Sequence, residues 1–220
     1  MRTRQDDWEL LRAWREGDRG AGDTLVQRHF AAIGRFFHNK VNDPEDAAEL
    51  VSQTFLACTE SRDTFRAEVP FSRFVFRLAV KTLQQFLRKK YKREREKVDF
   101  GELCLEQLYE GSLTTQLARK ETLRRLAHAM RCIPLDFQIA LELNIFEGLS
   151  GREIGELLGI PEATVRGRLR LGKARLSKQL ARERPASERE DARPEDLEQW
   201  AHEIRLLLDR TIPIPTAGRE

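Results

Sequence analysis

Cysteine is scarce in this sequence, and the three cysteines stand far apart. Cys58, Cys104 and Cys132 include no CxxC pair. Such an arrangement argues against a zinc site and against the disulfide framework of a small secreted domain, and it fits a reducing compartment.

Long apolar runs are also missing. The first residues, MRTRQDDWELLRAW, contain no apolar core of signal-peptide length, and no later segment approaches the length of a membrane span. We therefore expect a cytoplasmic protein that is not inserted into a membrane.

The patterns that carry enzyme chemistry are absent as well. There is no GxxxxGK phosphate-binding loop, and the four histidines stand singly in helical segments without metal-ligand spacing. We therefore expect no metal site, no cofactor and no catalytic residue, so the protein is not predicted to be an enzyme.

The sequence is instead rich in helical periodicity, without β alternation of useful length. This predicts an all-α protein with two small helical domains joined by a linker, and an extra C-terminal helix. The expected parts are a first domain over 7–95, a linker over 96–118, a second domain over 119–182 and a C-terminal extension over 183–220.

The first domain should hold four helices. The first should end at the glycines at 17, 20 and 22, the third should begin at Asp43 and Pro44, and the fourth should run from about 70 to 95. The stripes expected to face inward are Leu25, Val26, Phe30, Ile33 and Phe37 in the second helix, Ala47, Leu50, Val51 and Phe55 in the third, and Phe71, Phe74, Val75, Leu78, Thr82 and Phe86 in the fourth.

Charge is unevenly distributed along the chain. Residues 41–60 contain five acids and no base, whereas 81–97 and 160–184 each contain eight bases and two acids. Residues 185–220 contain nine acids and five bases, and a helical stripe is predicted over 195–209. We interpret this last segment either as added core of the second domain or as a cover that modulates access to a basic surface.

The second domain contains the signals of a helix-turn-helix. In EGLSGREIGELLGIPEATV, Ser150 and Glu153 have the spacing of a capping box, and Gly159 permits the positive φ of a tight turn before Pro161. On the helix after the turn, the face expected to point inward is Val165, Leu169, Gly172 and Leu176.

The opposite face of that helix is basic, with Arg166, Gly167, Arg170 and Lys173 on it. Arginine can donate two hydrogen bonds to guanine or hold phosphates, and the second helix of such a motif enters the major groove. A solvated charged face is the alternative. The capping box, turn, proline and basic face occur together in the right order, which favours DNA recognition.

At this point the sequence resembles a family. IPLDFQIALELNIFEGLSGREIGELLGIPEATVRGRLRLGKARL looks like region four of the extracytoplasmic-function group of bacterial sigma factors, the promoter-specificity subunits of RNA polymerase. The segment from Asp43 to Arg93 resembles region two of the same family through Asp46, Leu50, Gln53, Phe55, Phe65–Arg66 and Phe71. Together the resemblance covers about residues 7–181, and it assigns region two to 7–95 and region four to 119–182.

The resemblance implies the partners and the residues that contact them. One partner would be core RNA polymerase, which would be bound through its β′ coiled coil and its β flap. The other partners would be promoter DNA and, as in many relatives, an anti-sigma factor. The −35 element would be contacted by Thr164, Arg166, Gly167, Arg168, Arg170, Leu171, Lys173 and Arg175. The −10 element would be captured and melted by Phe65, Arg66, Phe76, Lys81, Arg88, Lys89 and Lys90, with Phe76 as the better exposed ring. The residues that would bind polymerase are Asp46, Glu49, Leu50, Gln53 and Phe55. Of these, Leu50 is better suited to the hydrophobic core of the domain than to the interface.

Two other classes of function stay open from the residues alone. The protein could be a stand-alone helix-turn-helix regulator that binds duplex operators as a dimer. It could also be an interaction protein that sequesters polymerase and never reads DNA, although the basic blocks in both domains count against this. A sigma factor would initiate transcription at specific promoters together with core polymerase, whereas neither alternative would.

Overall fold

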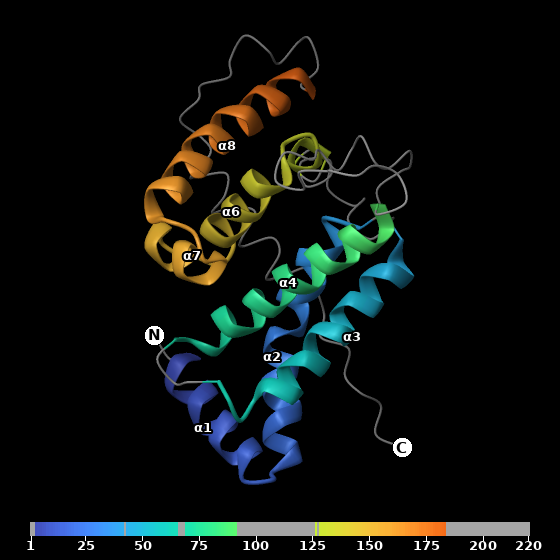
Figure 1. Ribbon diagram of the computed structural model, residues 1–220, viewed down its shortest axis with the longest axis vertical. Helices are drawn as coiled ribbons and strands as arrows, with labels where there is room; N and C mark the ends of the chain where they lie inside the picture. The colour runs from blue at the N-terminus through green and yellow to red at the C-terminus, as the bar shows by residue number, and fades with distance from the viewer. Residues whose placement is uncertain (1–2, 42, 66–68, 92–125, 127, 184–220) are drawn as a thin grey trace. The chain divides into compact units, whose positions relative to one another are not determined.

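The computed structural model describes residues 3–41, 43–65, 69–91, 126 and 128–183, and the secondary structure in these ranges is α-helical without any strand (Figure 1). The predicted all-α class is therefore confirmed. The described residues belong to two compact units, an N-terminal one that ends near Arg93 and a C-terminal one. No helix in the described ranges is long and apolar enough to cross a membrane.

Four helices build the N-terminal unit: α1 (Thr3–Arg15), α2 (Arg19–His38), α3 (Pro44–Ser61) and α4 (Phe71–Tyr91). In this unit α2 packs against α1, α3 and α4, and α3 packs against α4 (Figure 1). The start of α3 is as predicted, because the Asp43 side chain accepts a hydrogen bond of 2.8 Å from the Glu45 amide and Pro44 takes the first helical position.

The glycines between α1 and α2 do not all end a helix. Gly17 has a φ of +103° and lies in the connection, but α2 begins at Arg19, so Gly20 and Gly22 lie inside it. The prediction that these two stop the first helix is wrong. The reason is packing, since a Cβ on Gly22 would lie only 2.5 Å from the Trp14 indole nitrogen, and glycine leaves the room that the ring occupies.

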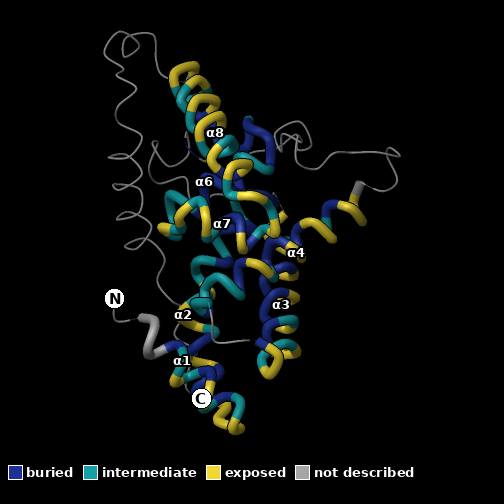
Figure 2. Tube along the Cα trace, turned by 60° about the vertical axis from the view of Figure 1, so that its left-hand side comes forward, coloured by how far each residue is buried: buried dark blue, intermediate teal, exposed yellow. Residues whose placement is uncertain are grey.

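The inward face of α4 is broader than the predicted stripe. Phe71, Val75 and Thr82 are buried as expected, whereas Phe74, Leu78 and Phe86 are only half-buried. The remaining buried positions are Phe76, Ala79, Val80, Leu83 and Leu87. Helices α1, α2 and α3 all contact α4. A helix covered from several sides buries more than one stripe, and buried and exposed stretches alternate along α4 (Figure 2).

The buried face of α2 also differs in part from the predicted stripe. Leu25, Ile33 and Phe37 are buried, but Phe30 is 43% exposed, and Phe36 is buried although it lies outside the predicted set. The predicted burial of Phe30 is therefore wrong. Its ring is not isolated, because it stacks on Phe55 of α3 with the ring centroids 6.0 Å apart.

The C-terminal unit contains α6 (Leu135–Ile145), α7 (Gly151–Leu158) and α8 (Glu162–Glu183), with a further helical turn at 128–131. Helix α8 packs against both α6 and α7. One buried hydrophobic cluster of this unit consists of Leu126, Ala129, Met130, Ile133, Leu141 and Leu176. The predicted linker over 96–118 and the predicted helix over 195–209 lie outside the described residues.

An acidic side chain ties α1 to α2 and yields a pH prediction. Asp7 is 7% exposed and accepts hydrogen bonds from Arg28 at 3.1 Å and from His29 at 3.0 Å. Burial raises the pKa of Asp7, but the hydrogen bonds and charges of His29 and Arg28 outweigh it, so the pKa lies below the ordinary value of 3.8. A lowered carboxyl pKa stabilises the fold above the unfolded-state pKa, and this stabilisation is lost as the pH falls through the folded-state value.

We therefore expect Asp7→Asn to lower the free energy of unfolding by roughly 1–2 kcal/mol near pH 6. The difference from the wild type should close as the pH drops below about 4. Urea unfolding at several pH values measures this difference directly. His38, whose pKa burial lowers, titrates in both proteins and cancels. If the difference in unfolding free energy between the two proteins stayed constant down to pH 3, the ionised Asp7 carboxylate would not be the source of the stabilisation.

Candidate nucleic-acid interface

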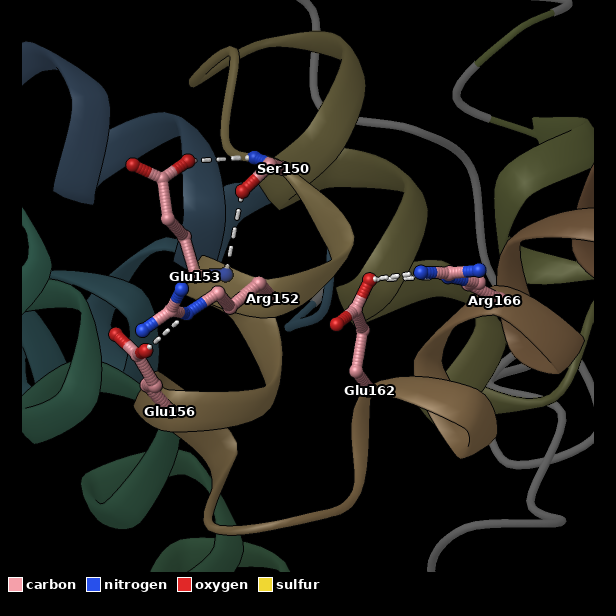
Figure 3. A network of polar contacts seen from close by, with 6 residues as sticks. All are labelled: Ser150, Arg152, Glu153, Glu156, Glu162 and Arg166. Carbon is pink, nitrogen blue, oxygen red and sulfur yellow. Dashed lines mark hydrogen bonds and ion pairs between the residues drawn. The ribbon is translucent and has the colours of Figure 1, made fainter.

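The turn of the helix-turn-helix is built as the sequence predicts. The Ser150 amide donates to a Glu153 carboxylate oxygen at 2.7 Å, and the Glu153 amide donates to Ser150 Oγ at 3.3 Å, so both halves of the capping box are present (Figure 3). Gly159 ends α7 in the left-handed region with a φ of +69°. Pro161 directly precedes α8, and its carbonyl accepts from the amides of Thr164 and Val165. The reciprocal cap and the left-handed glycine together set the direction in which the chain enters α8.

Gly155 makes the tight turn possible. The amide of Ile160 donates to the Gly155 carbonyl at 3.0 Å. A Cβ built on Gly155 would lie 2.8 Å from the carbonyl oxygen of Ile160, closer than real Cβ atoms come to other heavy atoms. The backbone of the turn therefore occupies the space that a side chain would need. The sequence carries little sign of this role of Gly155, because its only signal is a glycine inside a short amphipathic helix.

The inner face of α8 is the predicted one. Val165 and Leu176 have no exposed surface, Gly172 is buried and Leu169 is half-buried. A Cβ on Gly172 would lie 3.2 Å from atoms of both Phe137 and Leu141, which shows how closely α8 rests on α6. This packing fixes α8 against the rest of the unit, so its outer face is held on a rigid support.

The outer face of α8 is cationic and open to solvent. Arg166 and Arg170 are exposed, as are Thr164, Arg175 and the apolar Leu171, which is 44% exposed. Gly167 and Lys173 are half-buried. Arg166 is directed to Glu162, and its Nε and Nη2 atoms both donate to one carboxylate oxygen, at 3.0 and 2.5 Å (Figure 3). The Arg166 side chain is largely solvent-accessible and that of Glu162 is partly so, and Arg166 can therefore exchange Glu162 for another acceptor at little cost.

Two of the predicted DNA contacts also contact α6. Arg168 forms an ion pair with Asp136, and only 23% of its side chain is exposed. The Arg175 guanidinium lies 4.8 Å from the centre of the Phe137 ring. These contacts turn Arg168 away from the outermost face, whereas Arg166 and Arg170 stay on it.

The rings proposed for the −10 element are inside the N-terminal unit. Phe76 is 4% exposed and meets Phe36 edge to face at 5.8 Å, so the prediction of an exposed Phe76 is wrong. Phe65 is 9% exposed and lies between Trp8 and Phe74. The helical period of α4 alone could not predict the burial of Phe76, because the ring that it contacts, Phe36, belongs to α2. Arg66 lies outside the described residues.

The basic end of α4 is exposed as expected. Lys81, Arg88, Lys89 and Lys90 all present charge to solvent along the helix. Lys90 lies 5.0 Å from the Phe86 ring and 2.8 Å from an Asp46 carboxylate oxygen. One basic residue of α4 therefore meets the acidic start of α3.

The predicted polymerase surface divides into exposed and buried members. Glu49 and Gln53 are exposed and joined by a hydrogen bond of 2.8 Å, while Asp46 is half-buried against Lys90. Leu50 and Phe55 are buried, as their places on the predicted inward stripe of α3 indicate. Sequence reasoning missed Leu56, which is 60% exposed on the same helix and adds an apolar side chain to this surface.

Comparison with known proteins identifies the family. The model of the family described as ECF sigma factor matches residues 4–182. This chain belongs to the ECF sigma factor family. The resemblance seen in the two motifs is thereby confirmed across nearly the whole chain.

Curated proteins named as RNA polymerase sigma factors are similar to this chain over most of their length. The RNA polymerase sigma-H factor of Pseudomonas aeruginosa is 26% identical over 188 residues, which cover 82% of this chain and 96% of that protein. The ECF RNA polymerase sigma factor SigM of Mycobacterium tuberculosis is 27% identical over 179 residues, covering 81% and 87%.

Two solved structures share the fold. CnrH, in complex with the cytosolic domain of CnrY, gives a TM-score of 0.60 at 22% identity and covers 81% of this chain and 99% of its own. The sigma factor RpoE of Bartonella quintana, in complex with the anti-sigma factor NepR, gives a TM-score of 0.53 at 18% identity over 73% and 95%. At these identities the comparison establishes the all-α sigma-factor fold.

Proposed function

We propose that this ECF sigma factor binds core RNA polymerase and directs it to promoters whose −35 element is read by α8 and whose −10 element is opened by the N-terminal unit. The observation that carries the proposal is the helix-turn-helix, in which α8 is packed on its inner face and cationic on its outer face. A rigid helix with arginines on one side is suited to insertion into a major groove.

Within this proposal, Arg166 and Arg170 are the principal −35 contacts. Both are exposed on the outer face of α8, and a guanidinium can donate two hydrogen bonds to guanine or pin a phosphate. Leu171, exposed beside Arg170, can touch a thymine methyl group. Arg168 serves to hold α8 on α6 through Asp136, with a smaller part in DNA binding.

The −10 element is assigned to the basic end of α4. Lys81, Arg88 and Lys89 are exposed cations that can follow the backbone of a separated strand. Because Phe65 and Phe76 are buried, they shape the unit that presents these cations and do not themselves stack on bases in this conformation. No nucleotide hydrolysis is proposed, so the energy for opening comes from binding.

Polymerase binding is assigned to the outer face of α3. Glu49 and Gln53 offer acceptors, and the exposed Leu56 offers apolar surface, a combination that fits a partner of basic and apolar character. The two structural neighbours were solved with CnrY and with the anti-sigma factor NepR. We propose that a protein of the anti-sigma type can likewise hold this chain inactive.

One experiment tests the proposal against a stand-alone operator-binding regulator. Purified core polymerase with and without the protein is incubated with a library of bacterial promoter fragments, and specific transcripts are sequenced. A sigma factor yields initiation from a defined set of fragments only when both components are present. Tight binding of the free protein to a palindromic duplex without initiation would favour the regulator instead.

The assignment of α3 predicts a selective effect of Asp46→Arg. The Asp46–Lys90 pair is partly exposed on both sides, so its loss should change stability by less than about 1 kcal/mol. We expect the variant to bind core polymerase roughly tenfold more weakly, because a like charge then faces a basic partner. Affinity can be measured by fluorescence titration, with thermal unfolding in parallel.

Asp23→Arg is a matched control for this change. It makes the same charge reversal at an exposed position of α2, a helix to which no polymerase contact is assigned. It should leave the affinity near the wild-type value. Equal weakening by both variants would show that net charge matters and position does not, and unfolding of the Asp46 variant would make the residue part of the fold.

A further inference from the structure

Arg15, near the end of α1, is bound to the backbone of a segment far away in the sequence. Its Nε donates to the Arg62 carbonyl at 2.8 Å and its Nη2 donates to the same oxygen at 2.5 Å. Nη2 also donates to the Phe65 carbonyl. One side chain thus holds two backbone oxygens of the segment 62–65, which follows α3.

These carbonyls belong to the place where a helix ends. Arg62 caps α3, and the last carbonyls of a helix lack partners within it and favour a positive charge. The segment is also wound on itself, because the amides of Thr64 and Phe65 both donate to the Ser61 carbonyl, at 3.2 and 3.1 Å. The Arg15 guanidinium therefore completes the hydrogen bonding of a tight turn whose own amides are already used.

Two tryptophans of α1 contact the same segment. Trp8 stacks on the Phe65 ring with centroids 5.6 Å apart and planes 1° from parallel, and Phe74 stacks on it at 4.2 Å. The Arg62 guanidinium lies 5.4 Å from the Trp14 ring. Contacts from α1 thus fix both the backbone and the ring of the segment that leads from α3 toward α4.

We propose that Arg15 is a positioning residue for promoter opening. The inference rests on the proposed function, in which α3 binds polymerase and α4 holds the separated strand. Arg15 acts through the carbonyls of Arg62 and Phe65, which it keeps in one conformation before DNA binds. A preordered connection lowers the conformational cost of capturing a strand, whereas a loose one must be ordered at that moment.

The test compares Arg15→Met with Arg12→Met in holoenzyme formed with core polymerase. Methionine keeps the length and packing of the stem but removes every donor, and Arg12 is an exposed arginine on the same helix, so both variants lose the same charge. The probe is a promoter fragment chosen by its initiation with the wild type. Opening is followed by 2-aminopurine fluorescence well below the unfolding temperature, on the duplex and on a copy with a mismatched, pre-opened −10 segment.

We expect Arg15→Met to open the duplex promoter roughly tenfold more slowly, the size of effect that the loss of a charge-assisted hydrogen bond produces. Its affinity for core polymerase should match the wild type, and the defect should shrink on the pre-opened copy. Arg12→Met should open the duplex at the wild-type rate. Arg15→Lys, which keeps one donor group, should recover part of the rate.

Several results would overturn the inference. They are a wild-type opening rate in Arg15→Met, an equal defect in Arg12→Met, or an equal defect on duplex and pre-opened DNA, which would mean that Arg15 only stabilises the fold. If Arg15→Met does not fold, Arg15→Lys with the wild-type rate on both templates overturns it in the same way. If the wild-type holoenzyme initiates on no fragment, the proposed function fails first, which distinguishes the two failures.

Discussion

Replacing Gly155 with valine should collapse the helix-turn-helix. We expect the free energy of unfolding of the C-terminal unit to fall by roughly 2–3 kcal/mol and specific promoter binding to be lost. The expected cause is a clash with backbone, since the first atom of any side chain at this position would lie 2.8 Å from the Ile160 carbonyl oxygen.

The clash cannot be relieved by a small movement. The Ile160 carbonyl belongs to the turn that also holds the amide of the same residue on the Gly155 carbonyl, at 3.0 Å. Moving it breaks this hydrogen bond or shifts α8 away from α7. Loss of the turn would change the angle of α8, and the outer face would no longer meet the groove as one surface.

Gly167→Ala is the matched control. Gly167 also lies inside a helix of the same motif, but no atom lies within 4 Å of the Cβ that alanine would add. Alanine should stabilise α8 by about 0.5–1 kcal/mol, because glycine is the weaker helix former. Thermal unfolding of both variants gives the comparison, and promoter binding of the Gly155 variant is compared with the wild type, because Gly167 is itself a predicted DNA contact. A Gly155 variant as stable as the wild type would show that the turn is free to rearrange.

The local signals of the motif were sufficient to predict the helix-turn-helix. A capping box, a left-handed glycine and a proline act within a few residues, so Ser150, Glu153 and Gly159 adopt in the structure the roles that their spacing indicates. The inner face of α8 was predictable for the same reason, since one helical stripe packs on one neighbour.

Other features depend on contacts that a single sequence does not reveal. Phe76 is buried because α2 supplies Phe36, and Phe30 is exposed although it follows the apolar period of its helix. Arg15 binds backbone carbonyls, and every residue has one, so no residue type in the segment 62–65 marks it as a partner. The ion pair of Arg168 with Asp136 likewise depends on how α6 and α8 meet.

Arg166 and Arg170 are exposed whereas Arg168 is paired with α6, and this difference predicts a second large effect, on promoter binding. Arg166→Ala and Arg170→Ala should each weaken promoter binding by holoenzyme by roughly 1–3 kcal/mol, if each makes a bidentate contact to a base, with little change in stability. Both residues are exposed, and 73% of the Arg166 side chain is accessible even while it is paired with Glu162. An exposed pair of this kind contributes less than about 1 kcal/mol to folding, so its removal should be felt mainly on DNA.

Arg168→Ala should show the opposite balance. Its side chain is only 23% exposed and is paired with Asp136, so removal deletes an ion pair between two partly buried side chains and should lower the unfolding temperature. Promoter binding measured well below that temperature should fall less than in the other two variants.

Binding titrations at several salt concentrations separate two ways in which Arg166 and Arg170 can act. A phosphate contact weakens binding to all sequences alike and lowers the salt slope by about one, whereas a base contact relaxes preference at one position of the −35 element. If Arg166→Ala and Arg170→Ala both kept wild-type promoter binding and an intact fold, the outer face of α8 would not be the surface that contacts DNA. A loss of promoter binding only in Arg168→Ala would instead assign the DNA contact to the flank of α8 beside α6.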